Sequence, residues 1–162
     1  MKRGFTLMEV LISVAVIITV LVGVLSLATA SVSSIRINRS KIIADGLAEE
    51  GLELVKNIRE NNWLNYKRKA DNWRDGLSSG DYRVQYNLEN LLSYSVLPLK
   101  IDSNGFYQYD NGADTLFYRK ITIQHIDDYQ IRVIAQITWQ EGGRSNSLTA
   151  EARFYNWLEE TE

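Results

Sequence analysis

The stretch VLISVAVIITVLVGVLSLATASVSSI, from Val10 to Ile35, contains no Asp, Glu, Lys or Arg and consists mostly of Val, Ile, Leu and Ala. A straight helix over these residues would be roughly 39 Å long, at about 1.5 Å per residue. The hydrocarbon core of a bilayer is about 30 Å thick. The sequence therefore predicts a helix that spans a membrane with some tilt, or with one end protruding.

The chain as a whole has the composition of an ordinary folded protein. The 162 residues are 45% hydrophobic and 23% charged, and the formal net charge of -2 gives no sign of nucleic-acid binding. The chain contains no cysteine, so disulfides, thiolate catalysis and Cys-ligated zinc are excluded. The length predicts one globular domain with appendages.

Charged residues near the start of the apolar segment distinguish it from a plain signal anchor. Lys2 and Arg3 precede it, and short cationic N-terminal flanks tend to stay cytoplasmic, which predicts that the rest of the chain lies outside. Glu9 lies inside the apolar stretch that begins at Phe5. A carboxylate in a bilayer costs a few kcal/mol, about 2.5–3.5 for Asp on insertion scales and less near the interface, so Glu9 is a functional candidate.

The first ten residues, MKRGFTLMEV, carry a family resemblance. A short basic leader, a glycine, then Phe-Thr-Leu-x-Glu and a long apolar helix resemble the start of type IV prepilins and type II secretion pseudopilins. The resemblance implies cleavage after Gly4 by a membrane aspartyl peptidase, on the cytoplasmic side, and methylation of the new amine of Phe5. The implied partners are other pilin subunits, the prepilin peptidase, a membrane assembly platform and, before assembly, membrane lipid.

The resemblance also gives Glu9 a role. In a filament the apolar helices pack into a dry bundle, where an unpaired carboxylate is very costly. The implied counter-charge is the Phe5 amine of a neighbouring subunit. Because a misplaced subunit would leave both charges unpaired, the pair would set the axial register of the filament.

A conventional secretory signal is the main alternative for the N-terminus. Ala28-Thr29-Ala30 has the form of a signal-peptidase site, and cleavage there would leave a mature chain that begins at Ser31. The apolar stretch from Val10 to Leu27 is, however, longer than the usual core of a signal peptide, about 7–15 residues. We therefore favour the prepilin interpretation.

The expected organisation follows from these segments. We expect a leader at 1–4, a hydrophobic membrane and assembly helix at 5–35, an amphipathic continuation at 36–64, and an extracytoplasmic loop and β-sheet domain at 65–162. The expected fold class is α+β: a long N-terminal helix packed on a small antiparallel β-sheet, as in type IV pilins. The helix is expected to bend near Ser31–Ser34, if it bends at all.

The helix continuation shows two apolar stripes and a charged side. Helical spacing places Ile43, Leu47, Leu54 and Ile58 on one face. Ala44, Ala48 and Gly51 form a second stripe of small residues, which we interpret as packing on the domain's own sheet, with packing against neighbouring subunits as the alternative. The side chains expected to point mostly outward are those of Glu49, Glu50, Glu53, Lys56 and Arg59.

The C-terminal half predicts antiparallel strands, because apolar and polar residues alternate. One strand is predicted around Phe117, Ile121 and Ile123, with a turn at Asp127-Asp128. The loop Glu141–Asn146 is predicted to join the next two strands as a hairpin. Asn104-Gly105 and Asn111-Gly112 are further hairpin signals. The alternating apolar residues are Tyr82, Val84 and Tyr86 in an early strand, Ile131, Val133, Ala135, Ile137 and Trp139 in the second-last, and Leu148, Ala150, Ala152 and Phe154 in the last.

Residues 61–80 mix aromatic and basic side chains in a predicted loop. Such a mixture can hold single-stranded DNA by base stacking and phosphate contacts. The interpretation that we favour is a solvated loop whose tryptophans cap the core. The DNA hypothesis would use Trp63, Lys67, Arg68, Lys69, Trp73 and Arg74.

The sequence gives no catalytic set, and we expect no enzyme activity, no cofactor and no metal. His125 is the only histidine, and we interpret it as a structural residue within a strand. Several acidic and amide residues could form an oxygen-rich calcium site, but they coincide with turn signals, where Asp and Asn are common. Those residues are Asp102, Asn104, Asp110, Asn111 and Asp114.

Three functions remain open at this point. The leading one is a structural subunit of a type IV pilus-like filament, most simply a minor pilin. The second is a minor pseudopilin of a type II secretion system, and the third is a membrane-anchored binding module that never polymerises. The expected location is the cytoplasmic membrane, crossed once with the C-terminal domain outside, and then an extracellular pilus or a periplasmic pseudopilus.

Overall fold

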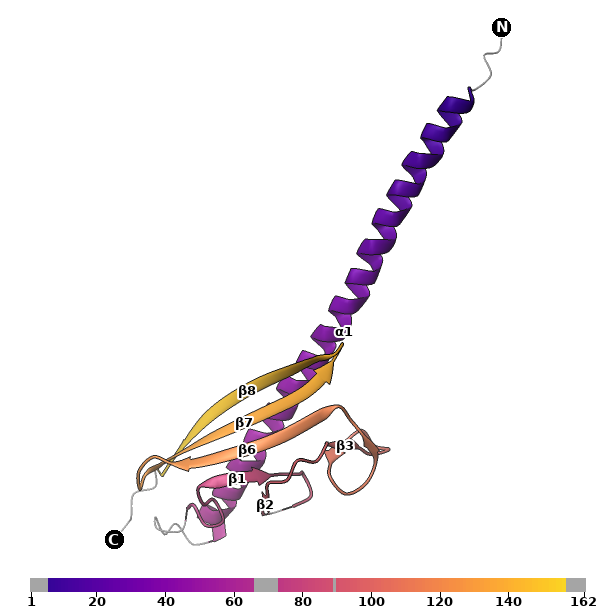
Figure 1. The fold of residues 1–162 in the computed structure, drawn as a ribbon. Coiled ribbons are helices and arrows are strands. Elements are labelled where there is room, and N and C mark those ends of the chain that lie inside the picture. Colours follow the sequence, from indigo (N-terminus) through magenta and orange to yellow (C-terminus); the bar gives the residue numbers. More distant parts are fainter. Residues whose placement is uncertain (1–5, 66–72, 89, 157–162) are drawn as a thin grey trace. The chain divides into compact units, whose positions relative to one another are not determined.

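The computed structural model describes residues 6–65, 73–88 and 90–156 (Figure 1). A single long helix, α1 (Leu7–Asn65), comes first, and the described strands follow it. The expected α+β class is confirmed to this extent: a long N-terminal helix packs on an antiparallel β-sheet. The strands are β1 (Gly80–Arg83), β2 (Leu92–Ser93), β3 (Lys100–Ile101), β4 (Tyr107–Gln108), β5 (Ala113–Asp114), β6 (Phe117–His125), β7 (Gln130–Glu141) and β8 (Arg144–Tyr155).

Two compact units divide the chain between Ser40 and Lys41. The first contains the apolar part of α1, which remains helical through the expected bend at Ser31–Ser34. The second contains the rest of α1, from Lys41, and all the described strands. Each unit is therefore described by itself.

The second unit holds a five-stranded antiparallel sheet in the order β2-β1-β6-β7-β8, and a small three-stranded sheet in the order β4-β3-β5. Two long ladders dominate the larger sheet. β6 pairs with β7 from Phe117↔Trp139 to His125↔Ile131, and β7 pairs with β8 over the full length of both strands. The predicted period-two strands are thus confirmed for β6, β7 and β8.

The hairpin between β7 and β8 is tighter than expected. Glu141 pairs with Arg144, so only Gly142 and Gly143 form the loop, and the predicted loop Glu141–Asn146 was too long. The two glycines have φ angles of 60° and 75°. Glycine takes such angles at little steric cost, and two consecutive residues with positive φ match the twist of a two-residue hairpin. Asn146 consequently belongs to β8.

The two Asn-Gly signals have different outcomes. Asn104-Gly105 lies between β3 and β4, which pair as a hairpin, as predicted. Asn111-Gly112 does not close a hairpin between β4 and β5, because each of these strands pairs with β3 instead. Gly112 has a φ of 118°, and a Cβ there would lie 2.2 Å from the Ile101 carbonyl oxygen. The glycine is needed for this close backbone approach.

The early strand is shorter than its alternation suggested. Tyr82 lies in β1, but β1 ends at Arg83, and Tyr86 lies in a turn. Val84 is buried just beyond the strand, and its carbonyl oxygen accepts a hydrogen bond from the Arg119 side chain at 2.7 Å. A long-range side-chain contact thus takes the place of a ladder bond here.

The face of α1 that packs on the sheet differs from the predicted one. Of the four large residues expected to be buried, Leu47 is buried, whereas Ile43, Leu54 and Ile58 are only partly buried. The centre of the contact is the stripe of small residues, which packs on the domain's own sheet as we interpreted it. A Cβ on Gly51 would lie 2.8 Å from Cδ1 of Ile121, so the helix approaches β6 very closely.

Two charged residues of α1 were wrongly expected to point outward. Glu50 is half-buried, and its carboxylate lies 3.3 Å from the Arg119 guanidinium. Arg59 is only 8% exposed, with its guanidinium 4.4 Å from the Trp63 ring centre and 4.9 Å from that of Phe154. The planar head and aliphatic stem of arginine suit such stacking, which helical spacing alone does not reveal.

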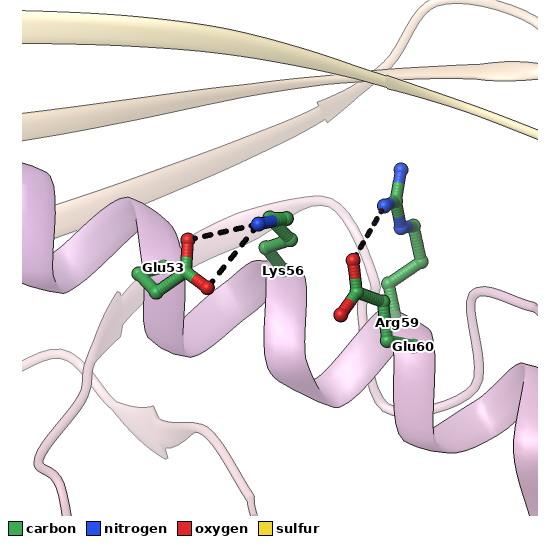
Figure 2. Close-up of polar contacts among 4 residues, drawn as sticks. All are labelled: Glu53, Lys56, Arg59 and Glu60. Carbon is green, nitrogen blue, oxygen red and sulfur yellow. Dashed lines mark hydrogen bonds and ion pairs between the residues drawn. The ribbon is translucent and has the colours of Figure 1, made fainter.

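Two of the charged residues expected to point outward, Glu53 and Lys56, pair with each other on α1, and Arg59 and Glu60 lie one turn further along (Figure 2). Lys56 reaches both carboxylate oxygens of Glu53, at 3.1 and 3.2 Å. Arg59 also reaches the Glu60 carboxylate, at 3.3 Å. Burial lowers the pKa of Arg59 from its ordinary value, and the Glu60 charge opposes this shift. Its ordinary pKa is so high that the arginine stays charged near neutral pH.

Candidate functional site

The apolar part of α1 is the most unusual surface of the chain. Its large side chains from Leu7 to Ile35 are exposed on every side of the helix, with Leu25, for example, 65% exposed. None of the residues from Val10 to Ile35 is buried. By length and composition the helix can cross a membrane, which supports single-pass anchoring.

Three hydroxyl groups within this segment, those of Ser13, Thr19 and Thr29, are satisfied by the helix itself. The hydroxyl of Ser13 donates to the Glu9 carbonyl oxygen at 2.8 Å, and that of Thr19 donates to the Ala15 carbonyl oxygen at 2.9 Å. Thr29 donates to the Ser26 carbonyl oxygen at 2.9 Å. Because unsatisfied polar groups are costly in hydrocarbon, these internal bonds make the hydroxyls compatible with a lipid environment.

Thr6 caps the N-terminus of α1. Its carbonyl oxygen accepts hydrogen bonds from the backbone N–H groups of Glu9 and Val10, at 3.1 and 3.2 Å. Its hydroxyl oxygen also accepts from the Glu9 N–H, at 3.3 Å. Thr6 is therefore the cap residue, and Glu9 is the third residue of the helix. The sequence signal, Thr-x-x-Glu before an apolar run, is that of a capping box, and our sequence analysis missed it.

The carboxylate of Glu9 has no hydrogen-bond or ion-pair partner within the described part of the chain. It lies in the first turn of α1, where the helix dipole favours a negative charge. The residues of the predicted cleavage and methylation site, Gly4 and Phe5, lie outside the described residues. The intersubunit pairing of Glu9 with the Phe5 amine therefore stays a prediction.

The two tryptophans of the aromatic and basic segment are part of the domain core. Trp63 is 9% exposed and Trp73 is 1% exposed, as expected if they cap the core. Rings buried in this way offer no open face for a nucleic-acid base. Arg74 donates to the Asp127 carbonyl oxygen and forms an ion pair with Asp128, both at 3.2 Å.

The basic residues Lys67, Arg68 and Lys69 lie outside the described residues. The described members of the DNA hypothesis, Trp63, Trp73 and Arg74, thus form contacts within the domain rather than an exposed stacking platform. The DNA contact consequently finds no support in the part of the chain that the structure describes.

The residues considered for catalysis or calcium binding have structural contacts. His125 lies at the end of β6 with its Nε2 atom 2.7 Å from the Leu77 carbonyl oxygen. One carboxylate oxygen of Asp102 accepts the backbone N–H groups of Asn104 and Phe106, at 2.8 and 2.9 Å, and so closes the β3–β4 turn. Asp110 accepts a hydrogen bond from the Gln85 amide at 2.7 Å.

Neither a ligand cage nor a catalytic constellation results from these contacts. Within residues 6–65, 73–88 and 90–156, no group of three or more His, Asp or Glu side chains is placed to hold a metal ion. The apolar helix with its capped, acidic first turn is therefore the candidate functional site.

Comparisons with protein-family models, with curated proteins and with solved structures found no match for this chain. Its function must therefore be argued from its own residues.

Proposed function

We propose that this chain is a structural subunit of a type IV pilus-like filament, cleaved after Gly4 and assembled through its N-terminal helix. The observation that carries the proposal is the position of Glu9. It is the one formally charged residue between Thr6 and Arg36, and it lies in the first turn of a helix with an entirely exposed apolar surface.

Assembly would change the environment of that carboxylate. When apolar helices pack together, water is removed from their surfaces, and an uncompensated charge among them costs several kcal/mol. The Phe5 amine created by cleavage would supply a positive charge from the neighbouring subunit. The resulting pair favours one axial offset between helices, because any other offset leaves two buried charges apart.

The capping geometry provides a competing explanation for Glu9. A glutamate at this position can stabilise the helix N-terminus without any neighbour, through the capping box and the helix dipole. Glutamine can also serve at this position of a capping box, but it carries no charge. The variant Glu9→Gln therefore keeps the capping-box role and removes the charge, whose local interaction with the helix dipole is worth only about 0.3–1 kcal/mol.

The experiment measures incorporation of the full chain into sheared filaments in cells that carry the assembly machinery. We expect Glu9→Gln to remain in the membrane at a normal level but to lose filament incorporation. Ser13→Ala is the matched control, since it removes a hydroxyl one turn further along and no charge. Normal incorporation of Glu9→Gln would reject the charge-pairing role and leave only the local one.

The orientation in the membrane is also part of the proposal. Lys2 and Arg3 precede the apolar segment, but Arg36, Arg39 and Lys41 follow it, so positive charges flank both ends. The positive-inside rule alone does not decide between these flanks. The outside location of the C-terminal domain is supported by the resemblance of the leader to prepilins, whose cleavage is cytoplasmic. Protease treatment of intact spheroplasts tests it, because an outside domain is degraded while the membrane is still sealed.

The two other functions predict different results in the same cells. A minor pseudopilin of a secretion system would leave surface filaments unaffected when deleted and would abolish export of a secreted cargo. A non-polymerising anchored module would be processed and membrane-bound, yet it would be absent from every sheared or pelleted filament fraction.

A further inference from the structure

A cleft of about 400 Å³ lies over β6, β7 and β8, and its lining includes the buried Trp139 beside residues of the opposite face of the sheet. Phe117, Ile137 and Trp139 have buried side chains on the core side. Because side chains alternate along a strand, Tyr118 and Thr138 belong to the opposite face, where they are directly paired across β6 and β7. The cleft thus lies over the end of the sheet near the β7–β8 hairpin.

The wall of the cleft combines aromatic, aliphatic and neutral polar groups. Tyr94 and Tyr118 supply rings, and Val96 and Leu116, which are 73% and 43% exposed, supply aliphatic surface. Exposed apolar side chains around a hollow are typical of a binding site rather than of plain surface. The volume also falls within the range of about 300–1,000 Å³ that is common for small-molecule sites.

The polar side chains of the cleft are available to a ligand. Among the described residues, no hydrogen bond joins a side-chain polar atom of Thr138, Gln140 or Ser145 to another residue, and the same holds for the two tyrosine hydroxyls. Hydroxyl groups can donate and accept, and the glutamine amide offers two donors and an acceptor. The cleft therefore presents both kinds of hydrogen-bonding group beside aromatic rings.

None of the described residues that line the cleft carries a charged side chain. Lys120 lies beside Tyr94, with its ammonium 5.9 Å from the ring centre, but it is paired with the Asp81 carboxylate at 3.7 Å. A phosphate, a carboxylate or an ammonium group would find no counter-charge in this lining. A purely apolar ligand would leave the hydroxyl and amide groups unpaired, at a cost of about 1–3 kcal/mol each when they are desolvated.

We propose that this cleft binds a neutral saccharide. A sugar ring has C–H faces that pack on aromatic and aliphatic surface, and an equatorial rim of hydroxyl groups that both donate and accept hydrogen bonds. Tyr94 and Tyr118 would contact the ring face, and Thr138, Gln140 and Ser145 would bind its hydroxyls. The inference uses residues of the second unit alone and is independent of whether the chain forms a filament.

The test uses the full chain in zwitterionic detergent micelles, because detergents with sugar headgroups would compete for the site. The probes are immobilised neutral disaccharides of hexose and N-acetylhexosamine, together with their sialylated and sulfated counterparts. We expect retention of one or more neutral probes, and binding that is insensitive to moderate salt. Failure to bind any neutral probe, or binding of the acidic probes alone, would overturn the proposal.

Matched variants localise the binding. We expect Tyr118→Ala and Gln140→Ala to weaken it about tenfold, the effect of one or two lost contacts. Tyr155→Ala and Gln124→Ala are the controls, since both residues lie at the other end of the long strands, outside the cleft. Tyr118→Phe keeps the ring if the alanine variant proves unstable, and it is expected to weaken binding less. Equal binding by cleft and control variants would place the saccharide elsewhere and reject the cleft.

Discussion

The guanidinium of Arg119 donates a hydrogen bond to the Leu47 carbonyl oxygen at 3.1 Å, so that a buried cation on β6 is tied to the backbone of α1. Arg119 is 1% exposed and also donates to the Val84 carbonyl oxygen at 2.7 Å. Its charge is compensated by Glu50, 3.3 Å away at the edge of the core. One side chain thus joins the helix, the central strand and the segment that follows β1.

Removing this side chain should destabilise the domain. In Arg119→Met the buried Val84 carbonyl loses its side-chain partner, whereas Glu50 can still reach water. We expect the free energy of unfolding to fall by about 1–3 kcal/mol, the cost of one unsatisfied buried group. Thermal unfolding of the full chain in detergent measures the loss. The control Arg132→Met removes an exposed ion pair with Glu151 and should change the free energy of unfolding little. Equal effects of the two variants would contradict the role given to Arg119.

The two glycines of the helix continuation should respond oppositely to alanine. Gly46 has no atom within 4 Å of its Cβ position, so Gly46→Ala should stabilise the helix by up to about 1 kcal/mol. In Gly51→Ala the new methyl group meets Cδ1 of Ile121 at 2.8 Å and Cδ of Arg119 at 3.2 Å. Overpacking costs about 1–3 kcal/mol, which matches or exceeds the propensity gain. The melting temperature should rise for the first variant and fall for the second, and a rise for both would show that α1 can move away from β6.

The phenol of Tyr109 should lose its proton at a higher pH than an ordinary tyrosine. Burial raises its pKa above the ordinary value of 10.0, although the nearby charge of Arg119 opposes the shift. Its hydroxyl donates to the Arg119 carbonyl oxygen at 3.3 Å, a bond that needs the proton. The folded state therefore holds the proton above pH 10 after the unfolded state has lost it, and stability falls as the pH rises from about 10 through the raised pKa.

Tyrosinate absorbance of the full chain in detergent, compared with that of Tyr109→Phe, isolates this group. The difference signal should appear at a higher pH than the titration of the exposed tyrosines, such as Tyr129. The variant should also lose less stability above pH 10. A difference signal that coincides with the exposed tyrosines would show that the phenol is not protected by burial.

The leader prediction is checked by the intact mass of native material. Cleavage after Gly4 and methylation predict a chain that begins at Phe5 and is heavier by one methyl group than the unmodified chain from Phe5. A chain that begins at Ser31 would support the secretory-signal alternative, and one that begins at Met1 would exclude processing. Either of these two results would remove the amine that the proposed Glu9 pair requires.

Local patterns in the sequence were sufficient to predict the long helix, its apolar half and the long strands. The helix was expected from Phe5 to Leu64 and is described from Leu7 to Asn65. These features depend on periodicity and on runs of apolar side chains, which are properties of neighbouring residues. The core side of β7 was predicted in full, because alternation assigns every second residue to the same face.

Other features were not predictable, because they depend on how closely distant segments approach. Arg59 was expected outside and is stacked on Trp63 and Phe154, the second of which lies on the last strand. Asn111-Gly112 has the sequence of a hairpin turn between β4 and β5. Both strands nevertheless pair with β3, which lies earlier in the chain. A turn sequence indicates where the chain can reverse direction, but it does not indicate which strand the next segment will pair with.

The sequence by itself determined that an acidic residue lies near the start of a long apolar helix, since this needs only the order of residues 6 to 35 and the chemistry of their side chains. Only the tertiary structure decided that Arg119 enters the core beneath that helix's continuation, and that Tyr94 and Gln140 line one cleft. The reason is physical: local order sets what each side chain can do, whereas burial and contact arise when segments far apart in the chain exclude water together.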